Sequence, residues 1–378
     1  MSKTAKIIAG LVVVVVIVLL IVSSGKKSET GPIKIGVIGP FSGDAASYGE
    51  AVKNGVAIAA DEINKAGGIN GKKLEIIFED GKCNSKDATS AANKLVQADG
   101  VKIILGGHCT PESAAIAPIA EANKVIQLAA ITSSPVMSSR GQYVFRTTSV
   151  STVQSTINAD IAINKLKGKN FAVLFEQTDY ARPIAEQFKT DIESKGGVVK
   201  IYEGFTPETN DFKTILAKIK SADVDAILLS PQRPDAALNI MKQLKELGVK
   251  KQLFGNDITI NQTFIDQSPE FYEGMIFAGP NYDPINNPKS KKFNDDYKNA
   301  FGFVPPFGIF TAESYDGVYI IADAIAKYGM DVDKIKNYLA NLKNYEGASG
   351  KITINEKHDG VRDYVAKVIK SGKIELYK

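Results

Sequence analysis

Short apolar runs and longer stretches with one apolar face follow one another along the chain from residue 33 onward. The run 33–38 (IKIGVI) has the length and character of a buried strand. The stretch 48–65 places Val52, Val56 and Ile63 on one side of a helix, and the glycine pair at 67–68 ends it. Strands that alternate with helices in this way predict an α/β fold, in which helices cover both faces of a parallel sheet.

The alternation runs in two series that are separated near 143–151 (YVFRTTSVS). A late segment has a strand pattern at 275–282, a long helix pattern at 312–328 and final strand patterns at 351–355 and 364–369. We expect this segment to cross back and complete both series, leaving a cleft between them. The first series predicts strands at 33–38, 74–78, 101–105 and 125–131 and helices at 48–65, 86–97 and 113–122; the second predicts strands at 170–175, 198–202, 226–230 and 252–255 and helices at 155–166, 181–195, 211–221 and 235–247.

The length of 378 residues favours two domains of about 150 residues each. We place the first lobe at 31–150 plus 280–350 and the second lobe at 151–279 plus 351–378. Charged residues make up 23% of the chain and the net charge is +4, a balance too ordinary to indicate a nucleic-acid partner.

The segment 1–30 differs from the rest of the chain. Lys3 and Lys6 precede an unbroken apolar run at 7–22 (IIAGLVVVVVIVLLIV), and small polar residues follow it. This run is longer than the core of a usual signal peptide and shorter than a typical membrane span of about 20 residues. It predicts export, with the protein either released as a cleaved, secreted form or held at the membrane by an uncleaved N-terminal anchor.

The only two cysteines are Cys83 and Cys109. In an exported protein an even pair favours a disulfide, and two free buried thiols are the alternative. A zinc site would need further ligands, and the chain offers only His108 and His358. We therefore expect no metal.

The most informative stretch is 106–113 (GGHCTPES), which follows the apolar run 101–105 and leads into a helix pattern. Glycines, a hydroxyl residue and a helix start at the carboxyl end of a strand leave backbone N–H groups free to hold a small anion or carboxylate. The run 125–131 leads into Thr132, Ser133 and Ser134 in the same order. The alternative is that these hydroxyl residues only cap helices.

The sequence gives no indication of an enzyme. It contains no G-x-S-x-G motif, no phosphate-binding P-loop and no metal-ligand cluster, and neither histidine lies in a recognisable catalytic arrangement. We expect a binding protein without a cofactor.

Several motifs resemble the type I extracytoplasmic solute-binding proteins of ABC importers, and among them the leucine/isoleucine/valine-binding branch. They are GVIGPFSGDAASYGE at 36–50, AADEINKAGGINGKKLEIIFEDGKC at 59–83, IILGGHC at 103–109 and YVFRTTS at 143–149. The resemblance covers nearly the whole chain from Ile33. It implies two doubly wound, Rossmann-like lobes joined by a three-strand hinge that closes on a ligand, and a disulfide between Cys83 and Cys109.

The resemblance also implies positions that hold an amino-acid ligand. The carboxylate would meet Thr110, the main chain of Ile131 and Ser133, with Thr132 and Ser134 as alternatives to Ser133. The ammonium would meet Asp257 in QLFGND at 252–257. A zwitterionic ligand needs this combination of neutral donors and one carboxylate, although Asp257 has the alternative role of capping the next turn.

Aromatic side chains complete the implied site. Tyr48 and Tyr180 match the aromatics that close over the ligand, although each precedes or begins a helix on which it could simply pack. A later aromatic wall falls on Phe310, with Phe307 nearly as good a match. These residues would give the ligand side chain an apolar surface.

Two features depart from the branched-chain pattern. Relatives usually carry Glu where this chain has Asp257, which is one methylene shorter. Gln232, Arg233 and Asp235 add polarity where the second lobe's wall is expected, so Arg233 either pairs with a ligand carboxylate or is an exposed arginine.

By implication, the chain is the extracytoplasmic solute-binding component of an ABC importer. It would act as a monomer, capture a branched-chain or other aliphatic amino acid and deliver it to the membrane permease. Two alternatives remain: a ligand-sensing ectodomain, and a binder of amides, urea-like compounds or polar amino acids.

Overall fold

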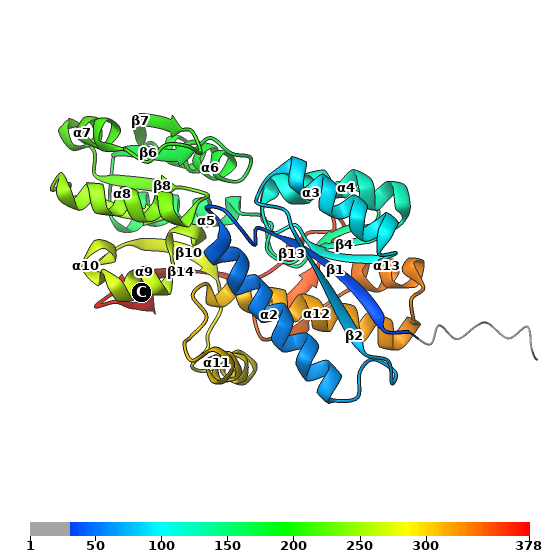
Figure 1. Cartoon of the computed structure of the whole chain (residues 1–378). Helices are drawn as coiled ribbons and strands as arrows, with labels where there is room; N and C mark the ends of the chain where they lie inside the picture. Colours follow the sequence, from blue (N-terminus) through cyan, green and yellow to red (C-terminus); the bar gives the residue numbers. More distant parts are fainter. Residues whose placement is uncertain (1–30) are drawn as a thin grey trace, which may run out of the picture.

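The computed structural model describes residues 31–378. Two lobes lie side by side, each built on a mostly parallel sheet with helices on its faces (Figure 1). The expected signal peptide or anchor falls on residues 1–30 and lies outside the described residues. Between residues 31 and 378, no helix combines the length and the apolar character that crossing a membrane requires.

The first lobe has a five-stranded sheet in the order β2-β1-β3-β4-β5, and all neighbouring strands are parallel. β3 and β4 are buried along their whole length, as strands with helices on both faces require. The predicted alternation is confirmed with one addition, because β5 occupies part of the expected break at 143–151. The elements are β1 (Ile33–Gly39), α2 (Ala46–Lys65), β2 (Leu74–Asp80), α3 (Ser85–Asn93) with a π-helical turn at Lys94–Ala98, β3 (Ile103–Gly106), α4 (Thr110–Asn123), β4 (Ile126–Ala129) and β5 (Val144–Arg146).

The second lobe has a seven-stranded sheet in the order β15-β14-β10-β9-β8-β6-β7. Its strands from β10 to β7 are parallel, and β14 and β15 join the other edge in antiparallel pairing. The elements are α5 (Thr152–Asp160) with a π-helical turn at Ile161–Lys165, β6 (Asn170–Glu176), α6 (Ala181–Ser194), β7 (Val198–Phe205), α7 (Lys213–Ser221), β8 (Ala226–Ser230), α8 (Pro234–Glu246), β9 (Gln252–Gly255), the 3₁₀ turn Asp257–Thr259, α9 (Gln262–Gln267), α10 (Pro269–Tyr272), β10 (Ile276–Pro280), β14 (Tyr364–Lys370) and β15 (Lys373–Leu376).

After β10 the chain returns to the first lobe, where its long helix α12 packs along α2. The expected strand at 351–355 is present as β12, but it pairs with β11 and β13 in a separate three-stranded sheet and not with the second lobe's sheet. The lobe boundaries at 31–150 with 280–350 and at 151–279 with 351–378 remain a prediction. The returning elements are α11 (Pro288–Phe301), α12 (Gly308–Tyr328), α13 (Val332–Ala340), β11 (Tyr345–Gly347), β12 (Gly350–Ile354) and β13 (Gly360–Val361).

The chain passes between the lobes after β5, after β10 and between β13 and β14. Arg362 in the last connection donates to the Thr147 carbonyl of the first at 2.8 Å and forms an ion pair with buried Glu313 of α12 at 3.2 Å. The Asn281 amide of the second connection donates to the Asp363 carbonyl at 2.8 Å. Hydrogen bonds thus hold the connecting segments together at one place between the lobes.

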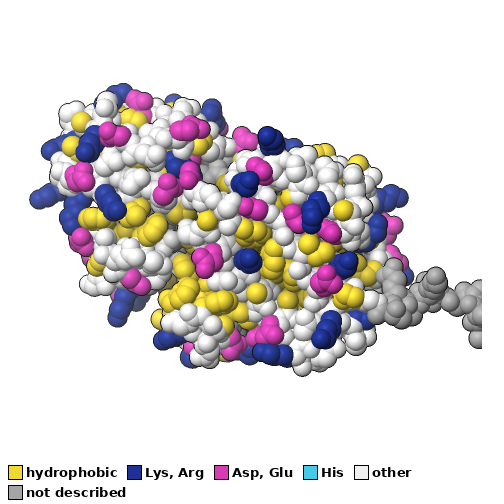
Figure 2. Space-filling view, in the orientation of Figure 1, with side chains coloured by type: hydrophobic (Ala, Val, Ile, Leu, Met, Phe, Trp, Pro, Cys, Tyr) yellow, Lys and Arg dark blue, Asp and Glu magenta, His cyan; other side chains and the backbone are white. Residues whose placement is uncertain are grey.

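On the face shown in Figure 2, basic and acidic side chains are interspersed over both lobes, with hydrophobic patches between them. Charges of both signs spread in this way are typical of a solvated surface.

Candidate functional site

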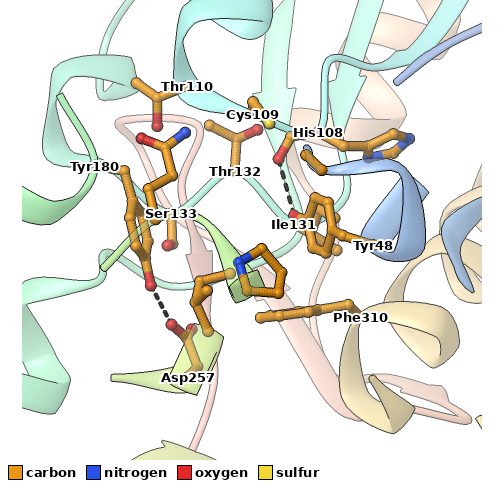
Figure 3. Close-up of a pocket in the computed structure, with 14 residues that line it drawn as sticks. Tyr48, His108, Cys109, Thr110, Ile131, Thr132, Ser133, Tyr180, Asp257 and Phe310 are labelled. Carbon is orange, nitrogen blue, oxygen red and sulfur yellow. Dashed lines mark hydrogen bonds between the residues drawn. The ribbon is translucent and has the colours of Figure 1, made fainter. Parts of the chain in front are cut away.

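One cavity lies between the two lobes, where loops at the carboxyl ends of strands from both sheets meet (Figure 3). Its empty space is about 430 Å³ including the opening to solvent. All seven residues predicted to bind the ligand line this cavity, namely Tyr48, Thr110, Ile131, Ser133, Tyr180, Asp257 and Phe310. Their contact with a ligand remains a prediction.

The first wall is the start of α4, whose first residue is Thr110. The predicted disulfide between Cys83 and Cys109 is confirmed, with a Cα–Cα distance of 5.2 Å. Buried Glu112 holds the same loop, because its carboxylate accepts hydrogen bonds from the amides of Cys83, His108 and Cys109. Burial raises the pKa of Glu112 to about 7, against the opposing effect of these amides. The start of this helix is thus fixed covalently and by hydrogen bonds, with its positive end at the cavity.

The loop after β4 supplies the second group of donors. The Thr132 hydroxyl donates to the Gly107 carbonyl at 2.7 Å, and the Ser134 hydroxyl donates to the Asp179 carbonyl of the other lobe. Within residues 31–378, the Ser133 hydroxyl forms no hydrogen bond with another residue, and Ser133 lines the cavity. Of the three neighbouring hydroxyl residues, Ser133 is thus the one free to meet a ligand.

An aromatic group closes the third side. The Tyr48 hydroxyl donates its proton to the His108 carbonyl at 2.9 Å, so it cannot donate that proton to a ligand. The Tyr48 ring faces the cavity (Figure 3). The rings of Phe307 and Phe310 pack edge-on against Tyr48 at centroid distances of 5.7 and 5.5 Å. Phe310 lines the cavity, whereas Phe307 lies behind this wall and lines a neighbouring groove.

Asp257 supplies the cavity's carboxylate. Tyr180 donates its hydroxyl to Asp257 Oδ1, and Gln154 of α5 reaches the same oxygen at 3.5 Å. The Asp257 amide donates to the Gln154 side chain at 3.1 Å, which fixes the backbone as well. Within the described part of the chain, Asp257 forms no ion pair with a lysine or arginine. The carboxylate is therefore oriented but keeps no positive partner.

Burial raises the pKa of Asp257, and the hydrogen bonds from Tyr180 and Gln154 act in the opposite direction. The pKa of Tyr180 is raised by its own burial and then by the negative charge of Asp257, so the phenol stays a proton donor. A cation placed beside Asp257 would lower the pKa of its carboxyl group and offset part of the cost of burying the charge.

Arg233 corrects one expectation from the sequence. It is neither exposed nor part of the cavity lining, since only 9% of its surface is accessible. Its guanidinium pairs with buried Glu176 at 3.1 Å and with Asp235 at 3.0 Å, and it reaches Asp44 of the other lobe at 3.6 Å. Arg233 therefore fastens loops around the site and does not offer its charge to a ligand.

The sequence prediction missed Gln154 and placed Gln232 only in the polar wall of the second lobe. Gln154 belongs to a helix that the pattern predicted only from residue 155. It orients Asp257, which is 103 residues further along the chain, and the sequence pattern does not reveal a contact over that separation. Gln232 was considered only for its polarity, and it lines the cavity beside Pro234. Among residues 31–378, no three histidine, cysteine, aspartate or glutamate side chains lie close enough together to hold a metal ion.

Comparison with known proteins agrees with this geometry. The family described as periplasmic binding protein matches residues 32–373. The leucine-, isoleucine-, valine-, threonine- and alanine-binding protein of Pseudomonas aeruginosa is 31% identical over 329 residues, which are 86% of this chain and 87% of that protein.

Solved structures give the same picture. The branched-chain amino acid transporter substrate binding protein LivJ from Streptococcus pneumoniae, in complex with isoleucine, is 28% identical with a TM-score of 0.84, covering 91% of this chain and 98% of that one. A solute binding protein from Rhodopseudomonas palustris, in complex with 3,4-dihydroxybenzoic acid, is 25% identical with a TM-score of 0.83, covering 91% and 95%. The match over nearly all of the described residues, together with the two-lobed α/β architecture, shows that this chain belongs to the periplasmic binding protein family, in its type I form.

Proposed function

We propose that this chain is the extracytoplasmic solute-binding component of an ABC importer and that it captures an aliphatic α-amino acid, with leucine, isoleucine and valine as the expected ligands. The family assignment supports the transport role, and the cavity supports the ligand class. Thr110 and Ser133 provide neutral donors for a carboxylate, and Tyr48 and Phe310 provide an apolar wall. Binding without catalysis is part of the proposal.

The observation that carries the ligand class is the lone carboxylate of Asp257. A neutral amide or an aromatic acid would leave this group buried without a cation, at a cost of several kcal/mol when the charge has no partner. An α-ammonium would satisfy it. The Rhodopseudomonas relative is described in complex with an aromatic acid; a ligand of that class would bring no cation to Asp257, which is why we expect an amino acid here.

The proposed mechanism is closure of one lobe on the other. Thr110 and Ser133 belong to the first lobe, whereas Tyr180 and Asp257 come from loops of the second. A ligand that first meets the donors of the first lobe gains the ammonium contact only when the second lobe approaches. Its affinity for both lobes therefore shifts the population toward the closed state, which the membrane permease would recognise.

A thermal-shift panel tests the ligand class. Protein freed of bound solute by unfolding and refolding is mixed with each of the twenty amino acids and with 3,4-dihydroxybenzoate, urea and short amides. We expect leucine, isoleucine or valine to raise the midpoint by several degrees, because ligand at 100 times its Kd stabilises the native state by about 2.7 kcal/mol.

Two leucine analogues serve as matched controls. 4-Methylpentanoate lacks the ammonium and leucinol lacks the carboxylate, and we expect each to stabilise the protein less than leucine does. A shift with 3,4-dihydroxybenzoate or an amide, without one for any α-amino acid, would contradict the proposal.

A further inference from the structure

Arg146 at the end of β5 is the largest of the fully buried side chains, with 2% of its surface accessible, and it does not line the cavity. Its Nε forms an ion pair with Asp359 at 2.7 Å, and Asp359 is itself buried. A buried charge is expensive even when it is paired, so this arginine calls for a role beyond filling the core.

The rest of the guanidinium binds the loop that carries Ser133. Its Nη1 donates to the carbonyls of Thr132 at 3.2 Å and Ser134 at 2.6 Å, and its Nη2 donates to the Ser138 hydroxyl at 2.7 Å. The carbonyl between these two, on Ser133, accepts from the Ser151 amide at 2.7 Å. Three consecutive carbonyls of this loop are thus each held by a hydrogen bond.

Holding these carbonyls also sets the direction of the amides. In a planar trans peptide the C=O of one residue and the N–H of the next point in opposite directions. When Arg146 binds the Thr132 carbonyl, the Ser133 N–H is turned away from Arg146, and Ser133 lines the cavity whereas Arg146 does not. Within residues 31–378, no group accepts a hydrogen bond from this amide, and it lies next to the free Ser133 hydroxyl.

We propose that Arg146 is a positioning residue for recognition of the ligand carboxylate, acting through the Thr132–Ser133 peptide. This inference rests on the proposed amino-acid ligand. An arginine suits the role because its planar guanidinium directs several N–H groups at fixed angles, so one side chain can bind two carbonyls and a carboxylate together. A lysine ammonium would reach fewer of these partners in a fixed geometry.

The test is a comparison of leucine with leucinol in Arg146→Lys, by calorimetric titration. Because the substitution should loosen a donor that meets only the carboxylate, we expect leucine affinity to fall at least about tenfold. Leucinol affinity should stay within about twofold of wild type. Arg140→Lys is the matched control, because exposed Arg140 binds the Val136 carbonyl in the same segment but no group next to Ser133; both affinities should be unchanged.

An equal loss for leucine and leucinol, or no loss for either, would overturn the proposal, because a purely structural role cannot distinguish the two ligands. If Arg146→Lys fails to fold, Asp359→Asn is the second variant. It keeps the arginine and should show a smaller loss that is again confined to leucine, so an equal loss for both ligands would again overturn the proposal.

A crystal structure of ligand-free Arg146→Lys separates this inference from the ligand assignment. We expect a rotated Thr132–Ser133 peptide; an unchanged peptide overturns the positioning role whatever the wild type binds. Absence of any amino-acid binding by the wild type would instead defeat the proposed function.

Discussion

Asp257 combines two requirements that conflict in an empty cavity: the group must be charged to attract an ammonium, yet burial favours its neutral form. The structure moderates the conflict with hydrogen bonds from Tyr180 and Gln154, which lower the pKa of Asp257 against the effect of burial. They also hold the carboxylate in place before the ligand arrives. Asp257 is one methylene shorter than glutamate, and this anchoring gives the shorter side chain a defined position.

Replacing Asp257 by asparagine should reduce leucine affinity by at least about 30-fold, because the ligand ammonium would be buried without its counter-charge. Titration calorimetry measures the effect. Asp179→Asn is the control, since Asp179 is exposed and directly precedes Tyr180, the partner of Asp257. An Asp257→Asn affinity within twofold of wild type would show that the ammonium is bound elsewhere.

From the residues alone, site positions could be predicted only where neighbours along the chain encode the chemistry, whereas Asp257 and Tyr180 were implied by the family resemblance. Thr110 follows directly from a strand, a glycine pair and a helix start. The resemblance favoured Ser133 with Thr132 and Ser134 as alternatives; the residues alone could not separate the three, because the choice depends on which hydroxyls find partners in other elements. Arg233 was expected to pair with a ligand or to be exposed for the same reason, because its actual partner, Glu176, is 57 residues away in the chain.

At the scale of elements, the start of α4 is the part of the site with the strongest support. Removing the disulfide with Cys83→Ser and Cys109→Ser should lower the free energy of unfolding by about 3 kcal/mol, because the bridge closes a loop of 26 residues in the unfolded chain. Urea unfolding of the variant and the wild type measures this difference. Equal unfolding free energies would show that the unfolded chain is not restricted by the bridge.

Strands and helices with regular apolar spacing were predicted well, and the irregular ones were missed. β5 has only the residues Val144–Arg146, too few for a period to be recognised. α11 is rich in lysine, and its few buried residues include Phe293 and Tyr297, so its apolar stripe is narrow. Such elements are stabilised mainly by the surfaces on which they pack, which the sequence does not show.

At the scale of the whole molecule, the lobes touch through polar contacts next to the cavity. Besides the Asp44–Arg233 pair, the Gln232 side-chain amide lies 3.5 Å from Cys83 Sγ. Such contacts exist only when the lobes are together, so they add to the stability of the closed form and, through it, to ligand affinity.

Asp44→Asn tests this contribution. The pair is partly exposed, with Asp44 73% accessible, so leucine affinity should fall by only about two- to fivefold, mainly through faster dissociation. Stopped-flow measurements of dissociation check it. Asp235→Asn removes another partner of Arg233 within the same lobe and should leave the dissociation rate close to wild type. An identical effect of both variants would indicate that the contact across the lobes does not matter.

The ion pair between Arg146 and Asp359 also has a consequence for the order of events during synthesis. Its two members are 213 residues apart in the chain. A ribosome adding 5–20 residues per second needs about 10–40 s to cover that distance. During this time Arg146 has no counter-ion, so burying its guanidinium in the first lobe would cost free energy. The final packing of the first lobe around Arg146 is therefore expected to wait until the late segment that carries Asp359 has been made.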